Sequence, residues 1–440
     1  MKVIRLHTLL LAMALLLPGL VSRAEDGGSY AGYTPYSVFG IGELAMPGSA
    51  YNKTMGGVGI ASRNSRFINV LNPAAVTARD SLAFMSDFSL YEANKILRQG
   101  DRTTANNLFN INDIIFSFPL FYSKVADGAM MVGIKPYSAT GYSYGYYDTN
   151  ATAISAVGNI AHSYSGLGSI YQAFATVGAE LFDRVSLGAE LTHYFGNIKK
   201  TYTETLTDAA AVGITKIDEL QLNANSAKFG LQYEQPFGEK LRIGVGAVYG
   251  LDARLGGRLI NTVKGGTEKK DTVQLGGSDR LYLAGEAGVG VSLTYGAKFR
   301  AEVDFTRSDW SNSGFSSVSG LAVNGAGGPI FTTGVCQSLR AGVEYIPNPN
   351  DIRYYYKHIA YRAGVYYTKE YFSVSGNEIY SRGITIGATL PVFRWSNGLT
   401  LGMEIGQRGS LKNNMVRETY VGFNLGVNLF DVWFQKPMYE

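Results

Sequence analysis

The chain after residue 81 alternates apolar residues with polar or small ones, with a period of two. The last such segment places Val421, Phe423, Leu425, Val427 and Leu429 on one face and Tyr420, Gly422, Asn424, Gly426 and Asn428 on the other. Successive side chains of a β-strand point to opposite faces, so this is a strand pattern. It predicts about fourteen strands, at residues 82–91, 112–122, 130–144, 162–180, 185–204, 219–234, 241–263, 272–293, 298–306, 334–346, 354–369, 379–390, 399–408 and 417–429.

The connections between these strands alternate in length. The longer set is 92–111, 145–161, 205–218, 264–271, 307–333, 370–378 and 409–416, and the shorter set includes 123–129, 181–184, 235–240 and 294–297. Long loops on one side and short turns on the other are typical of outer-membrane barrels, whose short turns face the periplasm. We therefore expect an all-β fold, a 14-stranded antiparallel transmembrane β-barrel over residues 81–430, with residues 431–440 as a periplasmic tail.

The first 24 residues have the features of an export signal. Lys2 and Arg5 form a short basic region, residues 9–17 form an apolar run, and Ser22 and Ala24 are the small residues before a cleavage site. The apolar run is too short to span a bilayer as a stable helix. Export combined with the barrel pattern predicts a multi-pass protein in the outer membrane of a Gram-negative bacterium.

Charge and cysteine content exclude several classes of protein. The formal net charge of +4 falls to 4 − 3 = +1 when the signal is removed with Lys2, Arg5 and Arg23. A nucleic-acid binder would need a basic face, so no nucleic-acid partner is expected. Cys336 is the only cysteine, which excludes an intrachain disulfide framework and a multi-thiolate metal site. No cofactor and no metal are expected.

The predicted strand number also requires something inside the barrel. An eight-stranded barrel is filled by its own side chains, whereas sixteen or more strands enclose an aqueous channel. Fourteen strands fall between these cases. The segment 25–80 is rich in Gly, Asn, Ser and Pro, lacks the strand pattern, and is long enough to fold into the bore. We expect it to form an N-terminal hatch that plugs the lumen.

Two stretches of the predicted hatch resemble a known family. Residues 33–46 read YTPYSVFGIGELAM, and residues 52–76 read NKTMGGVGIASRNSRFINVLNPAAV. A glycine-rich run followed by Asn-Pro-Ala just before the first strand is similar to the FadL family of transporters of hydrophobic compounds. The resemblance implies a monomeric 14-stranded barrel with a hatch motif at Asn72, Pro73 and Ala74, and a hydrophobic small-molecule ligand such as a long-chain fatty acid.

Charged residues also fall on the predicted lumen face. They are Glu190, Glu286, Arg300, Glu302, Arg340, Glu344, Arg362 and Glu404. Carboxylates and guanidiniums crowded in a narrow bore should pair, because an unpaired buried charge is costly. Two interpretations stay open. The charges form a layer that holds and releases the hatch, or they form an ion-pair network that stiffens the barrel without moving.

The sequence offers no persuasive catalytic site. Residues 141–145 match G-x-S-x-G around Ser143, but a nucleophile elbow needs a strand, a tight turn and a helix, and here the string lies in a tyrosine-rich strand end. The three mature histidines are far apart in the sequence. We expect the protein not to be an enzyme.

The leading functional expectation is passive uptake of hydrophobic small molecules across the outer membrane, in contact with membrane lipid and lipopolysaccharide. The alternative is a scaffold or secretion-associated barrel that binds exported or surface proteins, with loop 307–333 as the extracellular contact. An uptake channel should have an apolar groove that leads to the hatch. A scaffold should have a filled lumen and an exposed apolar patch.

Overall fold

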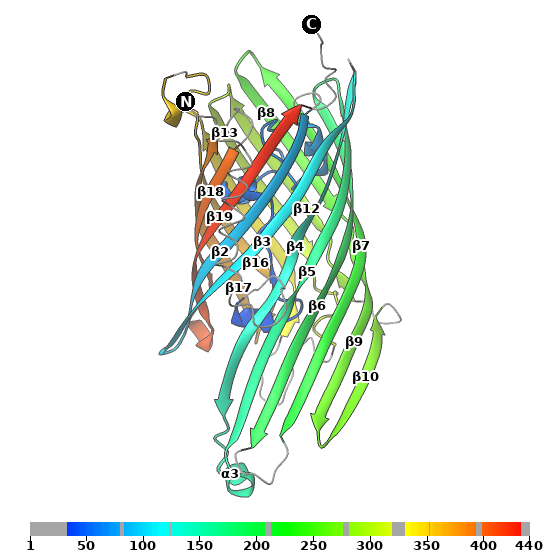
Figure 1. The fold of residues 1–440 in the computed structure, drawn as a ribbon, viewed down its shortest axis with the longest axis vertical. Coiled ribbons are helices and arrows are strands. Elements are labelled where there is room, and N and C mark those ends of the chain that lie inside the picture. Colours follow the sequence, from blue (N-terminus) through cyan, green and yellow to red (C-terminus); the bar gives the residue numbers. More distant parts are fainter. Residues whose placement is uncertain are drawn as a thin grey trace, which may run out of the picture.

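The computed structural model describes residues 33–79, 83–123, 125–206, 213–275, 281–318, 331–351, 353–392 and 398–432. Its wall strands are β2 (Ala83–Gln99), β3 (Arg102–Tyr122), β4 (Ala126–Tyr147), β5 (Ile160–Leu181), β6 (Val185–Leu206), β7 (Ile214–Phe237), β8 (Leu241–Gly250), β12 (Glu286–Tyr295), β13 (Phe299–Asp309), β15 (Val335–Tyr345), β16 (Ala360–Val374), β17 (Asn377–Pro391), β18 (Gly398–Gly409) and β19 (Arg417–Val432). Neighbouring wall strands pair antiparallel, and β19 pairs with β2 to close the cylinder (Figure 1). The predicted closed 14-stranded antiparallel barrel is confirmed.

The other elements lie inside or beyond this wall. The N-terminal part contains η2 (Pro35–Val38), β1 (Glu43–Leu44), α2 (Ala50–Thr54) and η3 (Pro73–Thr77). The remaining elements are α3 (Ala151–Val157), β9 (Ala253–Gly265), β10 (Thr267–Leu275), β11 (Tyr282–Leu283), β14 (Phe331–Thr333), η4 (Tyr355–Lys357) and η5 (Lys412–Asn414). Among the described residues, no helix combines the length and the apolar character needed to cross a bilayer.

The alternation of the strands decides between a membrane barrel and a soluble sandwich. Val289 and Val291 of β12 are 57% and 55% exposed on the outside of the wall, whereas Ser292 of the same strand is buried inside. Ile384 is likewise 59% exposed. A soluble sandwich would bury the apolar face of each strand, whereas a barrel in lipid turns it outward.

One end of the barrel carries tight turns and both ends of the wall sequence, at Ala83 and Val432. Turn residues at this end, such as Phe182, Asp183, Gly238 and Gly296, have positive φ angles. By the general pattern of outer-membrane barrels, we refer to this end as periplasmic and to the opposite end as extracellular. Residues 1–32 and 433–440, with the predicted signal peptide and most of the predicted tail, lie outside the described residues.

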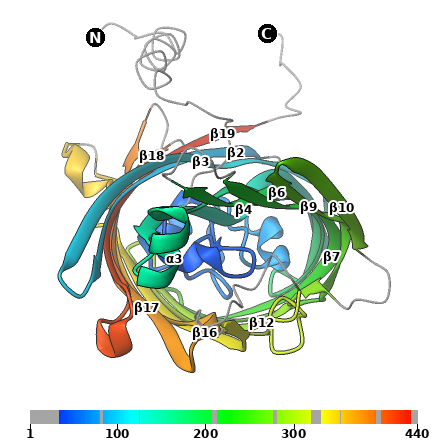
Figure 2. The same ribbon diagram turned by 90° about the horizontal axis from the view of Figure 1, so that it is seen from below.

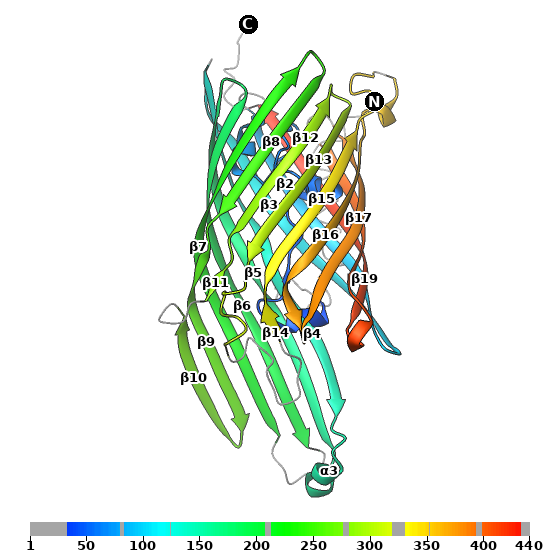
Figure 3. The same ribbon diagram turned by 180° about the vertical axis from the view of Figure 1, so that it is seen from behind.

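The extracellular end is uneven. The outer parts of β4, β5, β6 and β7, together with the β9–β10 hairpin, project well beyond the other strands and carry α3 at their tip (Figures 1 and 3). We call this projection the extracellular blade. The inner part of β7 pairs with β8, and its outer part pairs with β9.

The prediction that two of the segments each form one continuous strand was therefore wrong. The predicted strand 241–263 is divided into β8 and β9, and the predicted strand 272–293 is divided into β10, β11 and β12. The alternation of apolar residues continues through both breaks, because it depends on which face of a strand points outward and not on which strand lies beside it. The predicted loop 92–111 was also wrong. It is a hairpin of β2 and β3 with a turn at Gly100 and Asp101, and its polar exposed tip hides the strand pattern.

Candidate functional site

The N-terminal segment 33–79 lies in the lumen, where it appears in blue within the ring of strands (Figure 2). Most of its residues are buried, and η3 contacts β4, β5, β6 and β7 while α2 contacts β16 to β19. We refer to residues 33–79 as the hatch. Its backbone and side chains meet the inward faces of strands on opposite sides of the barrel.

The Asn-Pro-Ala motif forms the start of η3. The Asn72 side chain caps this helix by accepting a hydrogen bond from the Ala74 N–H at 2.9 Å. Its amide nitrogen donates to the Ile60 carbonyl at 2.7 Å and reaches the Leu231 carbonyl at 3.2 Å. Pro73 occupies the first helical position, where its missing N–H costs nothing. Asn72 thus joins two parts of the hatch to the wall strand β7.

Glycines make room for this motif. A Cβ at Gly230 would lie 2.0 Å from Asn72 Oδ1, and a Cβ at Gly188 would lie 2.3 Å from the Pro73 carbonyl carbon. Gly246 is equally close to the Ile60 carbonyl. Strand glycines of this kind mark the close approach of another backbone, and here that backbone is the hatch.

Three of the predicted lumen charges form one cluster under the hatch. Glu344 accepts from Arg362 Nε at 2.8 Å and pairs with Arg300 Nη1 at 3.8 Å. Arg300 also donates to the hatch hydroxyl of Tyr51 at 3.1 Å. The Arg362 guanidinium lies 4.6 Å from the ring centroids of both Tyr51 and Phe67, so the cluster also holds the hatch aromatics.

The other predicted charges lie at separate places. Glu302 accepts from the Ala61 N–H at 2.8 Å, and Arg340 donates to the Gly56 carbonyl at 3.0 Å. Glu404 accepts from the Tyr366 hydroxyl, and Glu190 accepts from two threonines. Glu286 stands at the extracellular end of β12, 3.9 Å from Lys228. The predicted set is therefore not a single layer, although most of its members face the lumen and several bind the hatch.

A second ion-pair network was missed by the sequence reasoning. Arg408 pairs with Glu43 at 2.7 Å, with Glu370 at 3.2 Å and with Glu418 at 3.5 Å. Lys95 adds a pair with Glu43 at 2.7 Å. The alternation of β18 and β19 could have identified Arg408 and Glu418, which lie two residues beyond the inward Gly406 and Tyr420. Asp304, which accepts from the Gly59 N–H at 2.7 Å, follows Glu302 in the same way.

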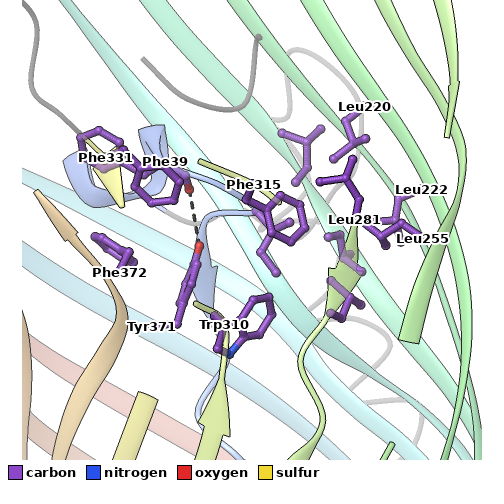
Figure 4. Close-up of a cluster of buried hydrophobic side chains, with 14 of the residues drawn as sticks. Phe39, Leu220, Leu222, Leu255, Leu281, Trp310, Phe315, Phe331, Tyr371 and Phe372 are labelled. Carbon is purple, nitrogen blue, oxygen red and sulfur yellow. Dashed lines mark hydrogen bonds between the residues drawn. The ribbon is translucent and has the colours of Figure 1, made fainter. Parts of the chain in front are cut away.

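An apolar cluster lies in the extracellular half of the lumen. Phe39 of the hatch stacks on Phe331 with ring centroids 5.4 Å apart, and the Tyr371 hydroxyl reaches the Phe39 carbonyl at 3.5 Å (Figure 4). The same hydroxyl donates to the hatch carbonyl of Gly42 at 2.8 Å. Trp310 and Phe315 are buried in the same cluster. They belong to the predicted contact loop 307–333, whose residues 319–330 lie outside the described residues. The described aromatics of that loop thus face inward and form no exposed patch.

A chamber of about 300 Å³ lies between this cluster and the body of the hatch. Its lining includes six basic residues, Lys53, Lys95, Lys135, Lys228, Arg340 and Arg408, and six acidic residues, Glu43, Glu190, Glu286, Asp304, Glu370 and Glu404. Sites for small apolar molecules are lined mostly by apolar and aromatic side chains with few polar groups. The chamber combines such apolar and aromatic side chains, among them Leu71, Tyr137, Leu283 and Trp310, with a high density of charge.

The barrel wall is open between β3 and β4. These strands pair only from Ile114–Ile134 to Tyr122–Asp127. Beyond that point, β3 residues 102–113 pair with β2 alone, and β4 residues 135–147 pair with β5 and, at Ser138 and Ala139, with β1 of the hatch. We call this divergence the β3–β4 seam. Leu108 and Asn112 on one side and Lys135 and Ala139 on the other line the chamber, which therefore reaches the seam.

The local sequence explains where the seam begins. The pairing of β2 with β3 shifts register between Asp113 and Ile111, and the pairing of β4 with β5 shifts between Pro136 and Ser138. Bulges bend strands and raise their local twist. Pro136 also lacks the N–H that a ladder would need. Both strands thus bend at the height where they part.

The G-x-S-x-G string around Ser143 does not form a nucleophile elbow. Ser143 lies within β4, and its carbonyl accepts from the Tyr33 hydroxyl. His162 contacts Tyr202, and His193 contacts Asn225. Within the described ranges, no group of three or more His, Cys, Asp or Glu residues is placed to hold a metal ion.

The fold and the lumen segment define a 14-stranded β-barrel that is plugged by its own N-terminal hatch (Figure 2). Over residues 8–440 the sequence matches the model of the BamG family, and the chain belongs to that family. A comparison with curated proteins gave no match.

Solved structures share the fold at low sequence identity. A Pseudomonas putida toluene transporter, TodX, is 13% identical with a TM-score of 0.55, covering 90% of this chain and 100% of TodX. The Ralstonia pickettii toluene transporter TbuX is 12% identical with a TM-score of 0.51, covering 86% and 97%. A Pseudomonas aeruginosa FadL homologue is 9% identical with a TM-score of 0.55, covering 89% and 100%. These neighbours are channels and transporters, not enzymes.

Proposed function

We propose that this barrel is an interaction protein of the outer membrane, which holds an exported or surface protein. The observation that carries the proposal is an unpaired strand edge in the wall beside a lumen that the hatch plugs. The aromatic cluster around Phe39 and Phe331 lies in the extracellular half of the bore, the hatch with its buried ion pairs lies below it, and the charged chamber lies between them. The β3–β4 seam meanwhile leaves strand edges for a partner in the plane of the membrane.

The chemistry of the chamber supports this proposal. Buried charged groups of the chamber are paired with polar side chains of the wall, since Lys53 donates to Asn112, Glu190 accepts from two threonines and Glu404 accepts from Tyr366. Removing hydration from an ionised group is costly unless a partner takes its place. A chamber with a dozen charges suits a barrel stiffened by ion pairs better than a barrel that passes hydrocarbons.

Uptake of hydrophobic small molecules, such as long-chain fatty acids, is a second proposal. Its specific support is the fold shared with the toluene transporters and the lateral connection from the chamber to the seam. An apolar molecule could then pass between the chamber and the bilayer through the wall. Extracellular loops, lipid and lipopolysaccharide would form the entry surface, and a monomer would suffice.

Native mass spectrometry of the barrel released directly from outer membranes distinguishes the two proposals. A stoichiometric protein partner with no bound fatty acid or hydrocarbon is the result expected of an interaction protein. Co-purifying apolar molecules that are lost in an Asn72→Ala variant, with no protein partner, would overturn that proposal in favour of uptake. Asn72→Ala removes the cap of η3 and the bonds to the Ile60 and Leu231 carbonyls.

A pair of tryptophan variants tests uptake in cells. Ala284 lines the chamber, whereas Val291 faces outward from the wall and is 55% exposed. For an interaction protein, Ala284→Trp and Val291→Trp should leave the accumulation of radiolabelled oleate and toluene equal to that of the unaltered barrel. A specific loss of accumulation with Ala284→Trp would establish the chamber as a passage.

A further inference from the structure

The outer half of β3 presents a strand edge without a neighbouring strand. Residues 102–109 pair with β2 across one edge only, and among the described residues no strand pairs with the other edge. Away from the seam, each wall strand has a neighbour on both sides. Unpaired edges are templates for the addition of another strand.

The hairpin turn shows which backbone groups point into the seam. Gln99 and Arg102 flank a turn of two residues, Gly100 and Asp101, and Gly100 has a φ of +55°. A two-residue turn is closed by a hydrogen-bonded pair, and such pairs alternate with non-bonded pairs along an antiparallel ladder. The register is continuous from this turn to Ile111. The N–H groups of Thr103, Ala105 and Asn107 therefore point away from β2 and into the seam.

Side chains place this edge at the boundary of the hydrocarbon layer. Phe109 and Ile111 are 46% and 54% exposed on the outer face of β3, as expected of lipid-facing residues. Two residues further out, Asn107 donates hydrogen bonds to Glu92 and Asn94 of β2, which marks the polar zone. Lipid tails cannot satisfy backbone groups, so the edge near Phe109 needs a polypeptide neighbour, and Thr103, Ala105 and Asn107 continue the same unpaired edge into the polar zone.

The opposite side of the seam already accepts an added strand. The hatch runs along the edge of β4, where the Thr34 N–H donates to the Gly141 carbonyl and the Ala45 N–H donates to the Tyr137 carbonyl, both at 2.9 Å. Between these bonds, β1 pairs with Ser138 and Ala139. The hatch thus covers the β4 edge from Tyr137 to Gly141, whereas no described strand covers the β3 edge.

We infer that the β3 edge, residues 102–109, is a docking site for an extended strand of a second outer-membrane or surface protein, which pairs antiparallel with β3. The inference rests on the proposed partner-binding function and identifies the surface that does the binding. A second copy of this chain fits poorly. Two copies in one membrane are related by an axis along the membrane normal, which sets their β3 strands parallel at equal height, whereas a parallel ladder needs an offset between its strands.

Amide hydrogen exchange at single-residue resolution tests the inference, because the two edges of β3 carry different N–H groups. Thr103, Ala105 and Asn107 report on the seam, and Thr104, Asn106 and Leu108 report on the ladder with β2. In native outer membranes both sets should be protected. In the purified barrel reconstituted alone into bilayers of extracted outer-membrane lipid, the seam set should exchange at least about a hundredfold faster, while the β2 set stays protected.

Two results would overturn the inference. Rapid exchange of the seam set in native membranes would mean that no strand binds there. Equal protection of that set in the barrel reconstituted alone would mean that lipid or the chain itself covers the edge. A stoichiometric partner that remains bound despite rapid seam exchange would preserve the proposed function and reject only this docking site.

A proline variant with a matched control adds a second test. Ala105→Pro removes one seam-facing N–H and leaves the β2 ladder intact, because proline is tolerated on a strand edge that faces away from its neighbour. Ala105→Ser keeps the N–H. Protection of Thr103 and Asn107 in native membranes should be lost in the proline variant and kept in the serine variant. Equal protection in both variants would contradict strand pairing.

Photo-crosslinkers at positions 103 and 107 give the direction of the bound strand. An antiparallel strand places the two crosslinks about four residues apart in one partner sequence, in reverse order. Crosslinks to scattered sites, to lipid, or to a second copy of this chain would overturn the inference.

Discussion

The two boundaries that could open in this barrel differ sharply. The boundary between the first and last wall strands, β2 and β19, has sixteen paired residues and runs from Ala83–Val432 to Arg98–Arg417. The boundary between β3 and β4 has eight, although β4 is the longer strand. The closing boundary joins the two ends of the wall sequence, yet it is paired along its whole length, and the opening lies between strands that are adjacent in the sequence. Local bulges and Pro136, not the order of the chain, thus determine where the wall parts.

The side chains in the lumen also differ between the two boundaries. Behind the closing boundary, Arg408 of β18 and Glu418 of β19 join Glu43 of the hatch, and Lys95 of β2 joins the same carboxylate. Behind the seam, the hatch replaces β3 along β4 and no comparable network of described residues joins the two strands. Ion pairs in the lumen thus connect the strands of the closing boundary, whereas at the β3–β4 seam the hatch covers β4 only.

Proline substitutions should give the largest contrast between the boundaries. Val421 pairs with Ile405 of β18 and with Asn94 of β2, so Val421→Pro removes a ladder hydrogen bond at the closed boundary. Proline is not tolerated within a central strand, and in lipid the freed carbonyl stays unsatisfied at a cost of several kcal/mol. We expect little folded protein, measured as the heat-modifiable band on unheated gels.

The matched variant is Ala105→Pro at the open edge, which should fold to nearly the amount of the unaltered barrel. Equal folding of the two variants would show that the closing boundary is not the firmer one.

Loss of Arg408 should have the next largest effect. Arg408→Met leaves Glu370 and Glu418 buried with their shared cation removed, and breaking a buried ion pair on one side costs about 3–5 kcal/mol. The midpoint of urea unfolding in detergent should fall. Arg408→Lys should recover part of the loss because it keeps the charge. An unchanged midpoint in Arg408→Met would mean that the network does not hold the closing boundary.

Much of the fold followed from the alternation of side chains, for a physical reason. Lipid outside and polar groups inside impose a period of two on each wall strand, so β17, β18 and β19 fall close to their predicted ranges. The choice of the neighbouring strand leaves no such pattern in the sequence. The division of residues 241–263 into β8 and β9 and the hairpin at Gly100 depend on long-range pairing, which a single sequence does not record.

The site was predictable only in part. The lumen side of Arg300, Glu302, Glu344 and Arg362 follows from the same alternation, and their burial requires partners. Which charged side chains pair depends on the path of the hatch. The hatch is an irregular segment, so its sequence has no periodic pattern from which that path could be predicted. The seam was not predicted at all, because Pro136 and the register shift at Asn112 acquire meaning only when two strands are seen to diverge.

A smaller effect is expected where the hatch rests on the wall. Gly230→Ala places a Cβ 2.0 Å from Asn72 Oδ1, so η3 must shift, at a cost of about 1–3 kcal/mol. Amide exchange in residues 60–77 should quicken, while exchange in β19 stays unchanged. Gly334→Ala is the control, because a Cβ there meets nothing within 4 Å. Slow exchange of the hatch in both variants would mean that η3 does not depend on this contact.

The smallest effect should come from the open side of the seam. Asn107 bonds to Glu92 and Asn94 on an exposed face of the β2–β3 hairpin. Water can replace both bonds, so Asn107→Ala should lower the free energy of unfolding by less than about 1 kcal/mol. Urea unfolding in detergent measures this difference. A loss as large as that of Arg408→Met would mean that the hairpin is held as firmly as the closing boundary, and that the β3 edge is structural and not a surface left open for a partner.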